Sequence, residues 1–335
     1  MTGERRVTGG QATGTHRAGR SGALGIGELL WDLLPVGPRL GGAPFNVAAH
    51  LARMGHRVGF LTAVGDDDLG REAIARARGL GVATDLVQVV RDVPTGTAGV
   101  HLDDTGQPTF DIHAPAAHER IRIGAEVLAA IAAAAPAAIV FGTLAQQAPA
   151  VRTITREILA ANADAMRVYD VNLREGCWTA ALVDELLREA SAIKLNDDEV
   201  TTLAGVLGID LGGTAGAGVR GAPGAERARA SVFAEAVAER YGVAVSCVTH
   251  GAAGATVRTP EGGASVPGIP VVVADTVGAG DAFTAGFVGR LLDGDSPATA
   301  LRFANALAAL VASREGAIPA WETSEVVGLA TRGAG

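Results

Sequence analysis

The chain is 335 residues long, with 48% apolar residues and a formal net charge of −8. This length and apolar content allow a sizeable buried core, in one large α/β domain or in two small ones. The acidic balance, with an isoelectric point near 5.4, argues against binding to nucleic acid or to an anionic membrane surface, because no basic stripe is available to neutralise phosphates. Lys194 is the single lysine and no G-x-x-x-x-G pattern precedes it, which excludes a P-loop nucleotide site.

The cysteines and the first residues of the chain indicate the cellular compartment of the protein. Cys177 and Cys247 are too few for a disulfide scaffold or a cysteine zinc site, which favours a reducing cytoplasm. No uninterrupted apolar run approaches the roughly 20 residues needed to span a bilayer. Residues 1–20 carry four arginines and lack the apolar region of a secretory signal. We therefore expect a cytoplasmic protein with a disordered extension at residues 1–20.

The early part of the chain alternates between strand and helix patterns. Ala23–Gly27 is a short apolar strand, and the imperfect alternation that follows it ends at Pro35 and Pro38. Apolar residues then repeat at helical spacing from Val47 to Met54. Asn46 lies at the start of this predicted helix, after two glycines, and the pattern alone fits an ordinary capping Asn. A second strand, Val58–Val64, and a second helix, Leu69–Gly79, continue the alternation.

Residues 95–113 interrupt this rhythm. Thr97–Leu102 and Pro108–His113 are strand-like, and the turn residues 103–107 join them as a hairpin. A hairpin has no place inside a parallel sheet, so we expect it to project as a flap that pairs with residues 29–40. Lids of this kind commonly close over a substrate and exclude water, although a purely structural edge hairpin fits the pattern equally well.

From residue 123 onward the alternation is regular. Strands are predicted at Ala138–Gly142, Arg167–Val171, Ala192–Leu195 and Ala244–Thr249, with helices at about 149–162, 179–190, 198–207 and 230–241. This alternation indicates a parallel sheet covered on both faces, in which ligands collect at the carboxyl ends of the strands. Polar residues cluster at those ends: Asp170, Asn172, Arg174, Asn196, Glu199, Thr249, His250 and Gly251.

Two later segments carry weaker patterns. Residues 211–230 are rich in Gly, Ala and Arg without periodicity, which predicts a mobile surface insertion. The G-x-G-x-x-G at Gly216–Gly221 follows no apolar strand and opens no apolar-periodic helix, which argues against a dinucleotide site. A long helix is predicted at about Pro297–Ser313. Residues after Ile318 are expected to be peripheral and to end in a tail at 321–335.

The most informative stretch is Asp275–Phe287, which reads DTVGAGDAFTAGF. It follows an apolar run, Ile269–Ala274, that predicts a strand, and it leads into a helical pattern over about Ala282–Leu292. A glycine-rich turn that opens a helix presents unpaired N–H groups at the positive end of the helix dipole, which suits an anion. Gly278 and Gly280 would let a phosphate approach the backbone closely.

Asp281 lies in the first turn of that predicted helix. A carboxylate beside a bound anion is unexpected unless it takes a proton from an attacking hydroxyl. The alternative makes Asp281 an ordinary N-terminal cap and the glycines a tight turn. Local pattern does not decide between these two hypotheses.

Three motifs resemble those of the ribokinase-like (PfkB) carbohydrate kinases. Gly41–Gly55 with Gly65 is similar to the first family signature, Asp275–Phe287 to the second, and Asn196-Asp197-Asp198-Glu199 to the N-x-x-E motif. The resemblance spans about residues 23–320. It implies a three-layer α/β/α ribokinase-like fold at 21–320, with a mostly parallel central sheet and a small β lid from about 28–40 and 95–113.

The resemblance also implies site residues. Asp281 would be the base that deprotonates a primary hydroxyl, and the N–H groups of Ala279, Gly280 and Asp281, next to Gly278, would stabilise charge on the transferring phosphoryl group. Substrate contacts are implied for Asp32, Gly41, Gly42, Asn46 and Phe110, and Arg174 would meet either a phosphate or the substrate. Nucleotide contacts are implied for Asn196, Thr249, Gly251 and Asn305, the last near adenine. Glu199 would orient Mg²⁺ through water.

The activity implied is ATP-dependent phosphorylation of a free sugar at a primary hydroxyl, with D-fructose favoured. The resemblance to bacterial fructokinases rests on Gly27–Asp32, Pro94–Thr97, Phe110–His113, and Asp170–Arg174 with Trp178. Kinases for 2-keto-3-deoxygluconate, ribose or a nucleoside are the alternatives on the same fold, and a degenerate sugar- or nucleotide-binding protein is the non-enzyme alternative. The single lysine favours an unphosphorylated acceptor. A response to K⁺ and a homodimer formed through the lid are further expectations.

Overall fold

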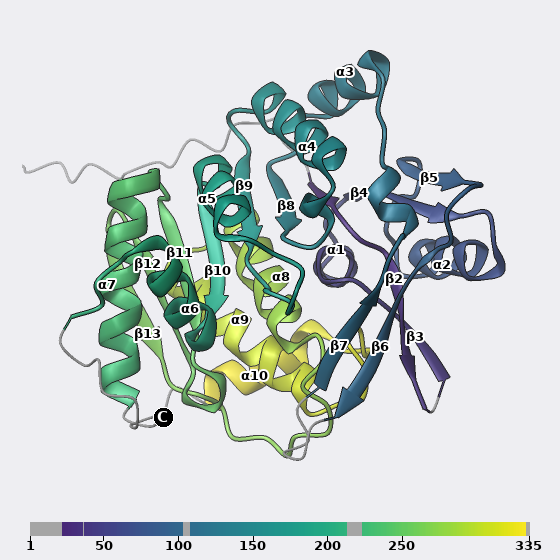
Figure 1. Ribbon diagram of the computed structural model, residues 1–335. Helices are drawn as coiled ribbons and strands as arrows, with labels where there is room; N and C mark the ends of the chain where they lie inside the picture. Colours follow the sequence, from purple (N-terminus) through teal and green to yellow (C-terminus); the bar gives the residue numbers. More distant parts are fainter. Residues whose placement is uncertain (1–21, 36, 103–107, 213–222, 333–335) are drawn as a thin grey trace, which may run out of the picture.

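The computed structural model describes residues 22–35, 37–102, 108–212 and 223–332 (Figure 1). Within them, nine strands form one sheet in the order β13-β12-β11-β10-β9-β8-β1-β4-β5. Strands from β11 to β5 run parallel, and β12 and β13 extend one edge antiparallel. Their bounds are β1 (Ala23–Ile26), β4 (Val58–Gly65), β5 (Val87–Val90), β8 (Ala138–Gly142), β9 (Met166–Asp170), β10 (Ala192–Asn196), β11 (Val245–Thr249), β12 (Ala255–Thr259) and β13 (Gly262–Val266). The predicted α/β class is confirmed.

Helices cover both faces of this sheet, which gives three layers. The helices are α1 (Ala43–Arg53), α2 (Asp68–Gly79), α3 (Ala125–Ala134), α4 (Pro149–Ala161), α5 (Ala180–Glu189), α6 (Asp197–Leu207), α7 (Pro223–Tyr241), α8 (Ala279–Leu292), α9 (Pro297–Ala312) and α10 (Thr323–Arg332). One buried cluster joins the sheet to α3–α7, and another joins its opposite face to α1, α2 and α8. Among the described residues, no helix is long and apolar enough to cross a membrane.

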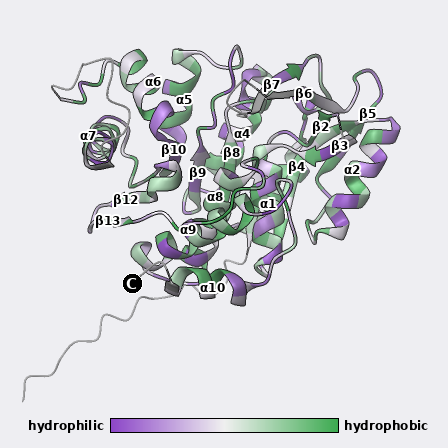
Figure 2. Cartoon of the chain, turned by 90° about the horizontal axis from the view of Figure 1, so that it is seen from below, coloured by the Kyte–Doolittle hydropathy of each residue, from purple (hydrophilic) through white to green (hydrophobic). Residues whose placement is uncertain are grey.

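The layers follow from the two-residue period of side chains along each strand. On β1, Leu24 and Ile26 face the cluster beneath α3–α7, whereas Ala23 faces the cluster beneath α1 and α8. On β4, Leu61 and Phe60 divide in the same way. Such strands are apolar on both faces, as central strands of a parallel sheet must be. Figure 2 shows mainly green and white along the central α8, whereas the outer α2 and α7 alternate purple with green.

A second, four-stranded sheet forms the predicted lid. Its order is β3-β2-β6-β7, and it lies at the lower right of Figure 1. The strands are β2 (Leu30–Leu34), β3 (Gly37–Gly41), β6 (Gly96–Leu102) and β7 (Pro108–His113). β2 and β3 pair antiparallel, and β2 pairs parallel to β6. The expected pairing of the hairpin with the early segment is therefore confirmed, and the hairpin turn at 103–107 lies outside the described residues.

The strand predicted at Ile269–Ala274 is wrong. This segment is irregular, and the side chains of Val272 and Val273 are 90% and 59% exposed. Pro270 has no N–H to donate to a strand ladder. The N–H groups of Ala274 and Asp275 instead donate to the carbonyl of Ala312 at the end of α9. The segment therefore contacts the end of α9 and leads into α8.

The insertion predicted at 211–230 is only partly correct. Residues 223–230 belong to α7, whose Ala, Arg and Glu residues are strong helix formers without a clear apolar stripe. The remaining part, 213–222, contains the G-x-G-x-x-G pattern and lies outside the described residues, as does the expected extension at 1–20. The antiparallel pair β12–β13, which the sequence pattern did not predict, follows β11 in the chain.

The expectation that residues after Ile318 are peripheral is also wrong. Trp321 and Val326 are 3% and 0% exposed and pack with α9 in one buried cluster. The Trp321 indole N–H donates to Nδ1 of His50 (3.0 Å), so the other ring nitrogen, Nε2, carries the proton donated to the Ala317 carbonyl (2.9 Å). Burial lowers the pKa of His50 to about 4, which keeps this ring neutral. The segment that contains Ala317 and Trp321 is thus attached to α1.

Candidate active site

A cavity of about 380 Å³ lies at the carboxyl ends of the parallel strands, between the lid and the start of α8. Sheets of this type present their ligand sites at this edge because the connecting loops converge there. Ten of the predicted site residues line the cavity: Asp32, Gly42, Asn46, Arg174, Asn196, Thr249, Gly251, Gly278, Gly280 and Asp281. The other predicted site residues with described side chains, Gly41, Ala279, Glu199 and Asn305, lie outside its lining. Phe110 belongs to β7, and its side chain is outside the described part.

The turn at residues 276–281, called the anion turn below, opens α8. Gly278 is the N-cap residue and has φ +78°, a left-handed conformation that glycine adopts without a steric cost. The Ala282 N–H donates to the Gly278 carbonyl (2.8 Å) and the Ala279 N–H to the Thr276 carbonyl (3.3 Å). Helix geometry leaves the N–H groups of Gly280 and Asp281 without intrahelical acceptors. These two groups, at the positive end of α8, are placed to hold an anion.

Asp281 is 8% exposed and points into the cavity lining. Its Oδ2 accepts a hydrogen bond of 2.7 Å from Nδ2 of Asn46 on α1. Burial raises the pKa of Asp281 to about 6; the negative charge of Asp170 adds to the shift, and the Asn46 hydrogen bond opposes it. A carboxyl with this pKa is ionised at neutral pH and yet basic enough to accept a proton.

The capping alternatives considered for these two residues do not describe the structure. The N-cap of α1 is Gly42, and Asn46 lies one turn further along. The N-cap of α8 is Gly278, and no side chain caps that helix. The side chains of Asn46 and Asp281 are therefore hydrogen-bonded to each other, although they lie 235 positions apart in the chain.

The lid side of the cavity is acidic. Asp32 on β2 and Glu28 after β1 both line it and are 7% and 4% exposed. Burial raises the pKa of Asp32 to about 6, and burial raises the pKa of Glu28 to about 7, while Arg174 opposes both shifts. A side chain at Gly41 would lie 2.5 Å from Oδ2 of Asp32, and one at Gly42 would lie 2.4 Å from the Glu28 carbonyl. Gly41 therefore allows the Asp32 carboxyl, and Gly42 the Glu28 backbone, to approach the start of α1.

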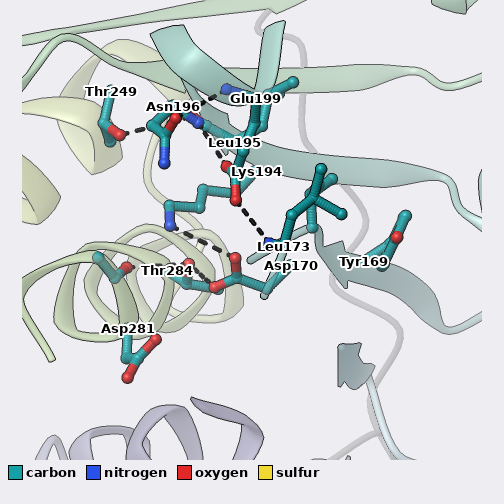
Figure 3. Close-up of polar contacts among 12 residues, drawn as sticks. Tyr169, Asp170, Leu173, Lys194, Leu195, Asn196, Glu199, Thr249, Asp281 and Thr284 are labelled. Atoms are coloured by element: carbon teal, nitrogen blue, oxygen red, sulfur yellow. Dashed lines mark hydrogen bonds and ion pairs between the residues drawn. The ribbon is translucent and has the colours of Figure 1, made fainter. Parts of the chain in front are cut away.

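Lys194 supplies positive charge next to the anion turn, and Figure 3 shows its side chain between β10 and α8, in contact with Asp170. Its Nζ lies 3.4 Å from Oδ1 of Asp170, whose Oδ2 accepts a hydrogen bond of 2.7 Å from Thr284 on α8. A Cβ at Gly280 would lie 2.8 Å from this ammonium group. Burial alone would lower the pKa of Lys194, but the charges of Asp170 and Glu199 outweigh it and hold the pKa above its usual value. Lys194 is therefore cationic at the edge of the cavity.

The N-x-x-E motif forms the start of α6. Oδ1 of Asn196 accepts from the Glu199 N–H (2.9 Å), and Oε2 of Glu199 accepts from the Asn196 N–H (2.8 Å), which completes a capping box. The second Glu199 oxygen accepts from the Leu173 N–H (2.8 Å). Burial raises the pKa of Glu199, and Lys194 opposes the shift. Glu199 thus orders two loops at the cavity, and Figure 3 shows the Asn196 side chain beside Thr249.

Asn305, the residue expected near adenine, lies outside the cavity lining. It lies on α9, and its Nδ2 donates to the Pro267 carbonyl (2.9 Å). This hydrogen bond attaches the loop that follows β13 to α9. His250, beside the predicted nucleotide loop, has Nδ1 2.7 Å from Oδ1 of Asp197. This contact ties the end of β11 to the first turn of α6.

Glu28, Lys194 and Asn172 also line the cavity. The sequence predicted no site role for Glu28 or Lys194, and it placed Asn172 only among the polar residues at the strand ends. Each carried a signal. Glu28 is an acid directly after an apolar strand, and Lys194 is a charge within one. Buried ionisable residues of this kind are uncommon unless paired. Asn172 follows β9 with φ +37°, a conformation that Asn tolerates better than most residues.

Comparisons with known proteins agree with this geometry. A family model described as pfkB family carbohydrate kinase matches residues 36–324. The chain is similar to fructokinase-1 of Oryza sativa subsp. japonica, with 28% identity over 335 residues, covering 91% of this chain and 96% of the relative. It is similar in structure to a fructokinase with bound ATP from Xylella fastidiosa, with TM-score 0.73 and 25% identity over 94% of this chain and 99% of that one. A putative ribokinase II of E. coli in complex with ATP and Mg²⁺ has TM-score 0.73 and 21% identity, covering 93% of this chain and 99% of that one.

Proposed function

Since this chain belongs to the pfkB family of carbohydrate kinases, we propose that it transfers the γ-phosphoryl group of ATP to a primary hydroxyl of an unphosphorylated sugar, with D-fructose as the favoured acceptor. The observation that carries the proposal is the contact between Asn46 and Asp281 at the anion turn. It supports a role for Asp281 as a base between a polar lid side, where the acceptor would bind, and a helix N-terminus suited to a phosphate. The fructokinase relative supports the choice of acceptor.

The proposed reaction uses this geometry directly. The acceptor hydroxyl oxygen forms a bond to the γ-phosphorus while its proton passes to the Asp281 carboxylate. The bond between the γ-phosphorus and the β–γ bridging oxygen breaks, and ADP leaves. The N–H groups of Gly280 and Asp281 stabilise the charge on the transferring group, and loss of one such donor typically costs about 3 kcal/mol of transition-state stabilisation. Asn46 keeps the carboxylate oriented toward the hydroxyl.

Mg²⁺ fits the residues present as an ion carried by the phosphates. Among the described residues no group of three or more His, Cys, Asp or Glu could hold a metal ion. Mg²⁺ usually keeps several waters and binds one or two carboxylates together with substrate phosphates. When bound, it would neutralise phosphate charge. Both oxygens of Glu199 accept backbone N–H groups, which favours the indirect, water-mediated role expected for this residue.

The nucleotide is proposed to lie over the ends of β10 and β11. Asn196, Thr249 and Gly251 line that side of the cavity. Lys194, beneath Gly280, would meet the phosphate chain. A contact of Asn305 with adenine stays a prediction. It would require the Asn305 side chain to contact both the Pro267 carbonyl and the base.

Arg174 favours a second candidate acceptor. Its charge acts on Glu28, Asp32 and Asp281 together, so it lies near the acceptor side of the cavity. A guanidinium group binds carboxylates in a bidentate manner. An acidic sugar such as 2-keto-3-deoxygluconate is therefore the alternative to D-fructose, with the same reaction at its primary hydroxyl.

The proposal is tested by ADP release from Mg-ATP with D-fructose, D-ribose, 2-keto-3-deoxygluconate, D-glucose, adenosine and fructose 6-phosphate. Asp281→Asn keeps the size of the side chain and removes the base, so kcat should fall about 10²–10⁴-fold while ATP binding, measured calorimetrically, persists. Near-normal kcat in this variant would refute the assigned base. A dominant signal from another acceptor would retain the mechanism and discard D-fructose.

Finer expectations belong to the same proposal. K⁺ dependence is measured by exchanging KCl for choline chloride at equal ionic strength. A homodimer through the lid is checked by light scattering. A cytoplasmic location is consistent with the free thiols of Cys177 and Cys247, and it stays a prediction.

A further inference from the structure

Arg39 joins the lid to the body of the protein. It lies on β3, directly opposite Asp32 in the register of the β2–β3 pair. Its Nη1 lies 3.3 Å from Oδ2 of Asp275, and its Nη2 lies 3.1 Å from Oε2 of Glu315. One guanidinium group therefore contacts two carboxylates that are 236 and 276 positions away in the chain.

Asp275 is the residue that orders the anion turn. Its Oδ1 accepts from the Val277 N–H (3.0 Å), and its Oδ2 accepts from the Gly316 N–H (3.0 Å). The second bond attaches the turn to the loop after α9, and that loop packs against Gly278, where a Cβ would lie 2.5 Å from Cα of Ala317. Arg39 thus contacts the carboxylate on which the position of the turn depends.

The ion pair is unsuited to a purely stabilising role. The side chains of Arg39 and Asp275 are 34% and 22% exposed, and solvent screens pairs of this kind so that they contribute little to folding. The Arg39–Asp275 pair instead connects the lid side of the cavity with its phosphate side. Asp32 belongs to the lid side of the cavity, and Gly280 and Asp281 belong to the phosphate side.

We propose that Arg39 is a positioning residue that couples the lid to the anion turn through Asp275. The inference rests on the proposed kinase function, because it assigns the acceptor to the lid and the phosphoryl group to the turn. The reacting atoms of the two substrates are held by elements without a direct peptide connection. An error of about 1 Å in their separation can cost on the order of 10²-fold in rate. The guanidinium fixes that separation.

The forked shape of the side chain matters for this role. Arg can contact both carboxylates at once, whereas a Lys ammonium is a single point of charge. Arg39→Lys should therefore keep part of the coupling, and Arg39→Ala should lose it. Neither change removes a group that touches ATP or the acceptor in the cavity lining.

The test compares full-length wild type, Arg39→Ala, Arg39→Lys and a matched control, Arg71→Ala. Arg71 on α2 likewise contacts two acidic side chains, Asp66 (3.4 Å) and Asp68 (2.7 Å), and lies outside the cavity lining. Arg39→Ala should lower kcat for the acceptor about 10–100-fold with little change in the KM for ATP. Arg39→Lys should lie between Arg39→Ala and wild type. Arg71→Ala should keep wild-type kcat, and added methylguanidinium should restore part of the activity of Arg39→Ala alone.

A second readout is independent of turnover. Hydrogen–deuterium exchange at residues 275–282 should accelerate in Arg39→Ala and stay unchanged in Arg71→Ala, because only the first frees Asp275. Unchanged kcat and unchanged exchange in Arg39→Ala would overturn the coupling. A wild-type protein that phosphorylates no acceptor would overturn the kinase proposal instead, and the exchange measurement would still report whether Arg39 orders the turn.

Discussion

Gly278→Ala probes the anion turn more sharply than any change of a charged residue. Gly278 has φ +78°, and an added Cβ would lie 2.5 Å from Cα and 2.6 Å from Cβ of Ala317. These distances are roughly 1 Å short of ordinary carbon–carbon contact. The obstacle is backbone, so no side-chain rotation relieves it. The turn that carries the Gly280 and Asp281 N–H groups must move instead.

The expected magnitudes separate two effects. The left-handed conformation costs a non-glycine residue about 1–2 kcal/mol, which should appear in the free energy of unfolding. A shift of about 1 Å in the N–H groups should lower kcat on the order of 10²-fold. Gly208→Ala is the matched control, because Gly208 ends α6 with φ +67° and a Cβ there would meet nothing within 4 Å. It carries the same backbone strain without a displaced turn.

The assays are urea unfolding and ADP release with the preferred acceptor. Both variants should lose the stability that the left-handed conformation costs, Gly278→Ala should lose more because its Cβ also meets Ala317, and only Gly278→Ala should lose turnover. If the two variants retained equal kcat, the packing of Gly278 against Ala317 would have no bearing on catalysis. The assignment of the anion turn would then be refuted, whatever the stability data showed.

Two further predictions concern protonation and the chain end. The kcat/KM should rise with pH through about 6, because Asp281 accepts a proton only when ionised and burial raises its pKa to about 6. Asn46→Ala removes a hydrogen bond that favours the carboxylate, so this rise should move to higher pH; an unmoved rise would belong to another group. Trp321→Phe removes the donor to Nδ1 of His50, which should lower the free energy of unfolding by about 1–3 kcal/mol in urea titrations while kcat persists. An unchanged unfolding free energy would contradict that role.

The parts of the fold that sequence predicted are those with a local cause. The start of α8 follows from glycines that permit a left-handed turn, and Gly278 adopts φ +78° there. The strands β8 to β11 were predicted from apolar runs, and their observed bounds differ by one residue or less. In these cases the residues within an element are enough to predict it, without knowledge of its partners in the fold.

The errors have non-local causes. The run Ile269–Ala274 is apolar enough for a strand, but β13 already forms the sheet edge and α9 supplies the acceptor for Ala274 and Asp275. Trp321 looked like part of a tail because its partner, His50, lies 271 residues away. Lys194 excluded one class of nucleotide site on sequence grounds, and only packing shows that it lies beneath Gly280. No local pattern contains such partners.

The charges along the cavity favour one arrangement of the two proposed substrates. Glu28 and Asp32 make the lid side acidic, and burial already disfavours their charged forms, so a phosphorylated sugar there would add a like charge to carboxyls that are short of solvation. Lys194 and the first turn of α8 make the opposite side positive. A neutral polyol on the lid side and a triphosphate on the α8 side satisfy both fields at once, whereas the reversed arrangement would bury like charges together. Asp281 lies between these two sides, which is where the proposed reaction needs a base for the proton released by the acceptor.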